Sequence, residues 1–171
     1  MEEKRDHESW KNWFQLHGPK LLLCARQWTR SAADAEDIVQ DAFVRFWRHQ
    51  RNLPGEPMAL LVTSIRRAAL DRARRDNRRA AREELTFAGG EGDCAYFESR
   101  LELDERRLVL EEALRRVPEE QREVLVLKIW GELTFEQIGV TLEISPNTAA
   151  SRYRYALLAL RRDLIATDCH G

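Results

Sequence analysis

The stretch that most restricts the fold lies between residues 38 and 47, where apolar side chains recur at i, i+1, i+4, i+5, i+8 and i+9. They are Ile38, Val39, Ala42, Phe43, Phe46 and Trp47. This spacing places them along one side of an α-helix, and it does not fit a strand, whose side chains alternate between two faces. The opposite side carries Asp37, Gln40 and Asp41. Asp34 precedes the apolar stripe and is predicted to cap the helix.

The rest of the chain is also predicted to be helical, so we expect an all-α fold made of two small modules. Trp10, Trp13 and Phe14 are spaced as one face of an N-terminal helix and are expected in the core. Gly18-Pro19 is expected to break that helix, and a further helix is expected over residues 21–28.

A basic helix is expected from about Met58 to about Arg82, after a turn at Asn52-Leu-Pro-Gly55. One side of this helix is apolar and the other is dense in arginine. The eight arginines are Arg66, Arg67, Arg72, Arg74, Arg75, Arg78, Arg79 and Arg82. Set against Asp71 and Asp76, they give a local charge of about +6, because 8 − 2 = 6. Adjacent like charges weaken an isolated helix, and a polyanion relieves that cost. A solvated basic face is the alternative interpretation.

The sign of the charge reverses after this helix. The acidic residues between 83 and 105 are Glu83, Glu84, Glu91, Asp93, Glu98, Glu102, Asp104 and Glu105, and Arg100 is the one base among them. The glycine-rich run Gly89-Gly90-Glu91-Gly92 lies in the same stretch. We therefore predict a flexible acidic linker over residues 83–107, between a first module of residues 1–82 and a second of residues 108–171.

The second module has the spacing of a helix-turn-helix. Helices are expected over 108–116 and 118–130, with Gly131 as a stop signal. Thr134 and Gln137 form a capping box, and Ser145-Pro146 begins a last helix that runs to about Leu164. The face of this helix that points away from the expected core carries Asn147, Ala150, Ser151 and Arg154, flanked by Thr148, Arg152 and Tyr155. Small and polar side chains there suit the major groove of DNA, although an ordinary helical hairpin would read similarly.

Other classes of function find no support in the residues. The chain has no phosphate loop, GxSxG or HExxH motif, so we expect no catalysis and no cofactor. The cysteines Cys24, Cys94 and Cys169 are far apart, and no metal site is expected. No apolar run approaches the roughly 20 residues that span a bilayer, and no signal peptide is evident. We therefore expect a cytoplasmic protein without membrane insertion.

The two basic segments, in this order, resemble the extracytoplasmic-function (ECF) group of the sigma-70 family, the dissociable specificity subunits of bacterial RNA polymerase. The sequence from Ala35 to Phe43, followed by Phe46-Trp47-Arg48, resembles the polymerase-binding helix of the family. The stretch from Leu61 to Arg75 resembles the helix that reads and melts the -10 element. Three pieces of the second module resemble the part that reads the -35 element, namely residues 117–127, 133–138 and 144–154. The resemblance implies a sigma region 2-like bundle followed by a region 4-like helix-turn-helix.

The resemblance also implies roles for individual residues. Core RNA polymerase would be bound by Asp37, Gln40 and Asp41. The -10 element would be contacted by Arg66, Arg67, Asp71, Arg74 and Arg75, while the turn Arg51, Asn52 and Leu53 would help hold a flipped-out base. The -35 element would be contacted by Asn147, Thr148, Ser151, Arg152 and Arg154. Unstacking a base costs a few kcal/mol, so melting requires such a pocket.

The sequence departs from the family pattern in three places. Leu61 stands where the family usually has Trp, and Ala68 stands where it usually has Asn. Ala149-Ala150 replaces a common Val-Lys pair. Losing that Lys removes one phosphate contact and lowers the salt slope of binding by about 0.9.

The function implied by the resemblance is that of an ECF sigma factor, which directs core polymerase to specific promoters and helps to melt the -10 element. Its partners would be core RNA polymerase, promoter DNA and an anti-sigma factor, where one exists. The alternative is a stand-alone helix-turn-helix regulator, which would need residues 134–164 and would have no use for the face of Asp37, Gln40 and Asp41.

Overall fold

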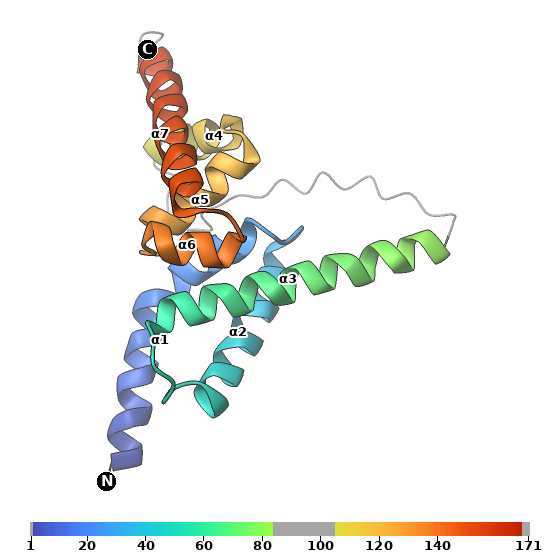
Figure 1. The fold of residues 1–171 in the computed structure, drawn as a ribbon, viewed down its shortest axis with the longest axis vertical. Coiled ribbons are helices and arrows are strands. Elements are labelled where there is room, and N and C mark those ends of the chain that lie inside the picture. Colours follow the sequence, from blue (N-terminus) through green and yellow to red (C-terminus); the bar gives the residue numbers. More distant parts are fainter. Residues whose placement is uncertain (1, 84–104, 169–171) are drawn as a thin grey trace. The chain divides into compact units, whose positions relative to one another are not determined.

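The computed structural model describes residues 2–83 and 105–168, and the regular secondary structure in those ranges is entirely α-helical (Figure 1). The chain divides into two compact units, residues 1–90 and residues 91–171. Most of the predicted acidic linker, residues 84–104, lies outside the described residues.

The first unit consists of α1 (Glu2–Arg26), α2 (Ala32–His49) and α3 (Pro57–Arg82), and each of these helices packs against the other two. The buried side chains are Leu21, Leu23, Cys24 and Ala25 of α1, Ala35, Ile38, Val39, Ala42 and Phe46 of α2, and Met58, Leu61, Val62, Ile65 and Ala69 of α3. The apolar stripe of α2 is therefore the central seam of this bundle. Burial raises the pKa of the Cys24 thiol to about 12, so this side chain stays neutral and packs as a small apolar group.

The predicted break at Gly18-Pro19 is wrong, because α1 continues through Pro19 as one helix. A proline inside a helix costs about 3 kcal/mol. Both halves of α1 pack against the rest of the bundle, which offsets that cost. Leu21 is fully buried on the C-terminal side, and the Phe14 and Phe43 rings lie 4.3 Å apart on the N-terminal side.

The predicted cap of α2 is also wrong. The helix begins at Ala32, and its N-cap is Ser31, whose hydroxyl accepts a hydrogen bond from the Asp34 N–H at 3.1 Å. Asp34 instead lies in the first turn, where its negative charge interacts favourably with the positive end of the helix dipole. The earlier cap leaves the Asp34 carboxylate available for a partner on another helix.

The second unit consists of α4 (Glu105–Arg116), α5 (Glu119–Ile129), α6 (Phe135–Leu142) and α7 (Pro146–Asp168). Its core includes Leu114, Val117, Leu125 and Ala156, against which Leu110, Trp130, Tyr153, Ala159 and Leu160 pack. Gly131 follows α5 as predicted, but the residue with positive φ is the next one, Glu132. Gly131 is needed for space, since a Cβ there would lie 2.6 Å from the Leu127 carbonyl oxygen.

Candidate nucleic-acid interface

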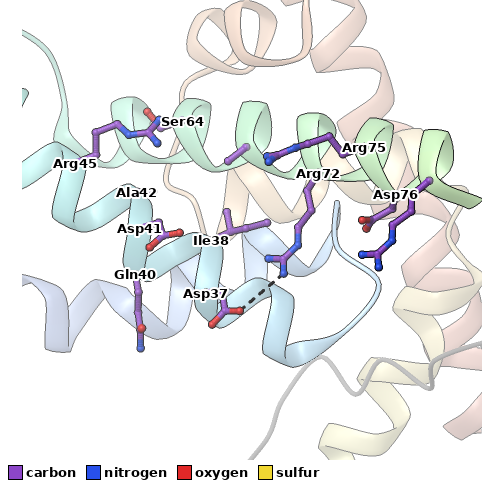
Figure 2. A pocket seen from close by; sticks show the side chains of 12 residues that line it. Asp37, Ile38, Gln40, Asp41, Ala42, Arg45, Ser64, Arg72, Arg75 and Asp76 are labelled. Carbon is purple, nitrogen blue, oxygen red and sulfur yellow. Dashed lines mark ion pairs between the residues drawn. The ribbon is translucent and has the colours of Figure 1, made fainter.

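A groove between α2 and α3 brings the two predicted sets of the first unit together. It has a volume of about 590 Å³ and is lined by Asp37, Gln40 and Asp41 of α2 and by Arg75 of α3, among other residues (Figure 2). Asp37, Gln40, Asp41 and Arg75 are all exposed. Acidic and amide side chains therefore outnumber the single cation, Arg45, on the α2 edge, and arginines outnumber the single acid, Asp76, on the α3 edge. Sequence spacing alone does not reveal this arrangement.

The two edges of this groove are joined by Arg72, which was not among the predicted site residues. Its guanidinium Nη2 lies 3.0 Å from Oδ1 of Asp34. The same nitrogen lies 3.9 Å from Oδ2 of Asp37 (Figure 2). A second tie lies beside it, where Arg30 Nη2 donates to Oδ1 of Asn77 at 3.1 Å. These contacts fix the middle of α3 against the start of α2. No sequence signal marks them, because the partners lie more than 30 residues apart along the chain.

The predicted -10 residues of α3 occupy more than one side of the helix. Arg67, Asp71 and Arg74 are exposed and follow one another at i, i+4 and i+7, so they form a single outward face. Arg74 Nη1 also lies 3.6 Å from the Asp71 carboxylate. Arg66 is half-buried, and Arg75 lines the groove toward α2. The outward face of three residues is thus the part of the set best placed to meet an extended polyanion.

In the turn that is predicted to hold a base, one residue is packed against a ring and two are exposed. The Arg51 guanidinium lies 4.4 Å from the centroid of the Trp47 ring, a cation–π contact that holds the start of the turn. Asn52 and Leu53 are exposed, Leu53 by 53%. An exposed apolar side chain at a turn is available to stack on a base, whereas Arg51 is already packed on an aromatic ring.

The departures from the family pattern fall in different environments. Leu61 is fully buried in the core of the first unit, so it acts on packing and has no surface with which to touch DNA. Ala68 is half-buried and lines the groove between α2 and α3. Ala150 is half-buried on α7.

The helix-turn-helix of the second unit is held by caps that the sequence predicts. Oγ1 of Thr134 accepts the Gln137 N–H at 3.2 Å, and Oε1 of Gln137 accepts the Thr134 N–H at 2.9 Å, so the capping box is confirmed. Ser145 caps α7 by accepting the Thr148 N–H at 3.1 Å. Gly139 allows the close turn, because a Cβ there would lie 2.8 Å from the Ile144 carbonyl oxygen.

The predicted recognition face of α7 divides into open and occupied residues. Asn147, Ser151 and Arg154 are exposed. Thr148 is exposed as well, although its hydroxyl lies 2.9 Å from the Ser145 hydroxyl. Arg152 is half-buried, and its Nη2 lies 2.8 Å from Oε2 of Glu120 on α5. This ion pair ties α7 to α5 and holds Arg152 toward its own unit.

Neither metal binding nor membrane insertion is evident in the described part of the chain. No group of three or more His, Cys, Asp or Glu side chains there is arranged to hold a metal ion. None of the helices within residues 2–83 and 105–168 combines the length and the apolar character needed to cross a bilayer.

Comparisons with known proteins agree with this arrangement. The Sigma-70 region 2 model matches residues 13–79, and the Sigma-70 region 4 model matches residues 107–160. The chain is 31% identical to the ECF RNA polymerase sigma factor SigK of Mycobacterium ulcerans (strain Agy99) over 144 residues, which cover 81% of this chain and 76% of the relative.

A second relative and one solved structure extend the likeness. The chain is 30% identical to the ECF RNA polymerase sigma factor SigL of Mycobacterium tuberculosis over 154 residues, covering 88% of this chain and 86% of the relative. The sigma factor RpoE of Bartonella quintana, crystallised with the anti-sigma factor NepR, has a similar fold, with a TM-score of 0.64. That match covers 92% of this chain and 97% of RpoE at 21% sequence identity.

Proposed function

The chain belongs to the ECF group of the sigma-70 family, whose members direct core RNA polymerase to promoters, and on that premise we propose which of its surfaces meet the polymerase and the DNA. The observation that carries the assignment is that region 2 and region 4 models match in order, over residues 13–79 and 107–160. A stand-alone helix-turn-helix regulator is not favoured, because it would have no use for a region 2 module.

Core RNA polymerase is bound by the exposed edge of α2 that carries Asp37, Gln40 and Asp41. An acidic and amide surface suits a basic partner surface, because complementary charge steers and orients association. Arg72, which pairs closely with Asp34, approaches Asp37 from the side of α3 at 3.9 Å. The docking surface therefore continues into the helix assigned to the -10 element, with one arginine shared between them.

The -10 element is contacted by the outward face of α3, with Arg67, Asp71 and Arg74 at its centre and Arg66 and Arg75 at its sides. The exposed turn of Asn52 and Leu53 precedes the N-terminus of α3. It receives a base of the melted strand, next to Arg51. Phosphate contacts by arginine position the protein, and a stacked base offsets part of the cost of unpairing.

The -35 element is read by α7 through Asn147, Ser151 and Arg154, with Thr148 and Arg152 beside them. Short polar side chains at the N-terminal end of a recognition helix reach base edges in the major groove. The Glu120–Arg152 ion pair sets the orientation of this helix against α5. RNA synthesis is carried out by the polymerase, so the chain itself acts without catalysis. Because the DNA lies in the cytoplasm, the chain acts there.

A partner that keeps the factor inactive is the remaining element of the proposal. RpoE of Bartonella quintana was crystallised with the anti-sigma factor NepR. For this chain, such a partner would have to cover the α2 edge or the DNA-facing helices. Pull-down from the source cells followed by inhibition of transcription in vitro would identify it, and transcription that is insensitive to every captured protein would contradict this part.

The polymerase-binding surface is tested by reversing its charge. Asp37→Lys combined with Asp41→Lys should weaken binding to core polymerase by roughly a hundredfold or more, because like charges then face each other across the interface. Glu119→Lys combined with Glu136→Lys makes the same change in net charge on exposed residues of the second unit and should have little effect. Binding is measured by co-purification and fluorescence anisotropy, with circular dichroism to confirm folding. Equal affinity of the first variant and wild type would remove these residues from the interface.

A further inference from the structure

A second groove of the first unit lies between α1 and α2, and its floor is aromatic. It has a volume of about 650 Å³, and its lining includes the aromatic side chains of Trp10, Phe14, Phe43 and Trp47. These four side chains are half-buried, while Val44 beside them is 47% exposed. The prediction that Trp10 and Phe14 lie in the core thus describes only one side of their rings. The other side faces an open groove.

The rings of the floor contact one another in tilted and edge-on pairs, and Trp13 beneath them joins the two pairs, with its ring 5.6 Å from Trp10 and 6.4 Å from Phe43. The Phe14 and Phe43 rings lie 4.3 Å apart, and the Trp10 and Trp47 rings lie 6.1 Å apart at a steep angle. His7 meets the edge of Trp47 at 5.7 Å. Rings that support one another in this way keep their positions when a partner binds, so little side-chain entropy is lost on docking.

The polar side chains of this groove are all at its rim. His7, Lys11, Gln15 and Arg48 are exposed and surround the aromatic floor. Among the lining residues that the structure describes, none is a carboxylate. A site for a small molecule needs polar groups set inside the cavity to orient the ligand. A charged rim around an apolar floor fits instead the long apolar face of a helix with charges along its edges.

The dimensions and charge of the groove specify the kind of helix. Its α1 side runs from His7 to Gln15, a length of about 12 Å at 1.5 Å per residue, which matches about two turns of a second helix. The rim cations Lys11 and Arg48 favour acidic residues on that helix. The side of α2 that faces α3 differs, because Asp37 and Asp41 outnumber Arg45 among its charged side chains in that groove. A basic partner surface that pairs with Asp37 and Asp41 would be repelled by Lys11 and Arg48 at the rim of this groove.

We propose that the groove formed by Trp10, Phe14, Phe43, Val44 and Trp47 binds an amphipathic helix of a partner protein that carries acidic residues on both sides of its apolar stripe. The helix lies between α1 and α2 with its apolar side chains on the aromatic floor. Its carboxylates pair with Lys11 and Arg48. This interaction is separate from the proposed contacts of Asp37, Gln40 and Asp41 and does not rest on them.

Two synthetic peptides of equal length test this proposal on the full chain. Both are helical and carry leucine at i, i+3, i+4 and i+7, which spans about two turns, and they differ only in having Glu or Lys at the flanking positions. We expect the acidic peptide to bind roughly fivefold or more tightly than its basic twin by fluorescence anisotropy at low salt, because of two rim ion pairs. The difference should shrink as salt is raised. Equal binding of the twins, or binding of neither, would overturn the proposal.

Variants locate the peptide on the molecule. Lys11→Glu combined with Arg48→Glu should reverse the preference, so that the basic peptide binds more tightly. Val44→Asp should abolish binding of the acidic peptide, whereas Val140→Asp, at a residue of the second unit that is 76% exposed, should leave it unchanged. Asp37→Lys should not weaken binding of the acidic peptide. That result would separate this groove from the polymerase-facing edge. A Val44→Asp variant that binds as well as wild type would place the peptide elsewhere and refute the assignment.

Discussion

The two basic helices of this protein, α3 and α7, present their charge in different ways. Beyond Ala69, α3 buries no further residue, and everything from Arg74 to Glu83 is exposed. Arginine side chains there bend back onto their own helix, as Arg78 Nε does toward the Arg74 carbonyl at 3.3 Å. By contrast, α7 packs Ala149, Ala156 and Leu160 into its unit and exposes short polar residues.

This difference indicates two kinds of DNA contact. A projecting, densely charged helix gains most from a polyanion, and its binding should depend steeply on salt. A recognition helix fixed by caps and ion pairs gains most from the geometry of its short side chains at base edges. The first helix should therefore be sensitive to loss of charge, and the second to small changes in the turn that positions it.

The largest expected effect is on the turn that positions α7. Gly139→Ala should lower the stability of the second unit by about 2 kcal/mol, because the new Cβ meets the Ile144 carbonyl oxygen at 2.8 Å. Binding to a -35 duplex should fall with it. The neighbouring change Val140→Ala alters an exposed side chain and should leave both properties nearly unchanged. Scanning calorimetry measures the stability, and a Gly139→Ala unit as stable as wild type would show that the turn does not need glycine.

The next largest effect concerns charge on α3. Arg67→Ala combined with Arg74→Ala should weaken binding of the polymerase complex to promoter DNA roughly tenfold and lower its salt slope by about 1.4 to 1.8. Arg154→Ala on α7 should lower the slope by at most about 0.9 while changing -35 preference more strongly. Arg162→Ala, whose guanidinium pairs with Asp163, serves as the control. Equal slopes for all three variants would erase the contrast between the helices.

A smaller effect of opposite sign is expected within the turn itself. Glu143 has φ of 57° and ψ of 43°, a left-handed conformation that glycine adopts more easily. Glu143→Gly should therefore stabilise the second unit by about 1 kcal/mol, whereas Glu136→Gly inside α6 should destabilise it. Hydrogen exchange over residues 134–164 reports both changes. Faster exchange in the Glu143→Gly variant would contradict the expected relief of strain.

The smallest effect tests a departure from the family pattern. Ala150→Lys adds a cation to the half-buried edge of the recognition face and should raise the salt slope of -35 binding by about 0.9, with a gain in affinity of a few fold at low salt. Ala166→Lys makes the same substitution at the far end of α7. A slope that rises equally for both variants would mean that the added charge acts at long range and not through a phosphate contact.

The helices could be predicted from the sequence because their signals are local. The stripe from Ile38 to Trp47 and the capping box of Thr134 and Gln137 act within a few turns, and both are confirmed. The start of α2 was missed because Ser31 and Asp34 are both good capping residues, and spacing alone does not rank them. The continuity of α1 through Pro19 depends on packing against other helices, which a local rule leaves out.

For the candidate site, the sequence could predict which residues are exposed. It could not predict which residues contact one another across helices. The exposure of Asp37, Asp41 and Arg154 follows from helical periodicity. The pairing of Arg72 with Asp34 joins residues far apart in sequence, so no local pattern could indicate it. The complete burial of Leu61 shows in turn that a residue that differs from the family pattern can change packing without touching DNA.

The function as a whole is tested by run-off transcription with core polymerase from the source organism and fragments of its genomic DNA. Adding the protein should produce transcripts from new start sites, and the Asp37→Lys and Asp41→Lys variant should produce none of them. The promoters recovered would share elements near -10 and -35 at a fixed spacing. If the protein creates no new start sites, or binds its DNA fully without polymerase, it does not work as a sigma factor.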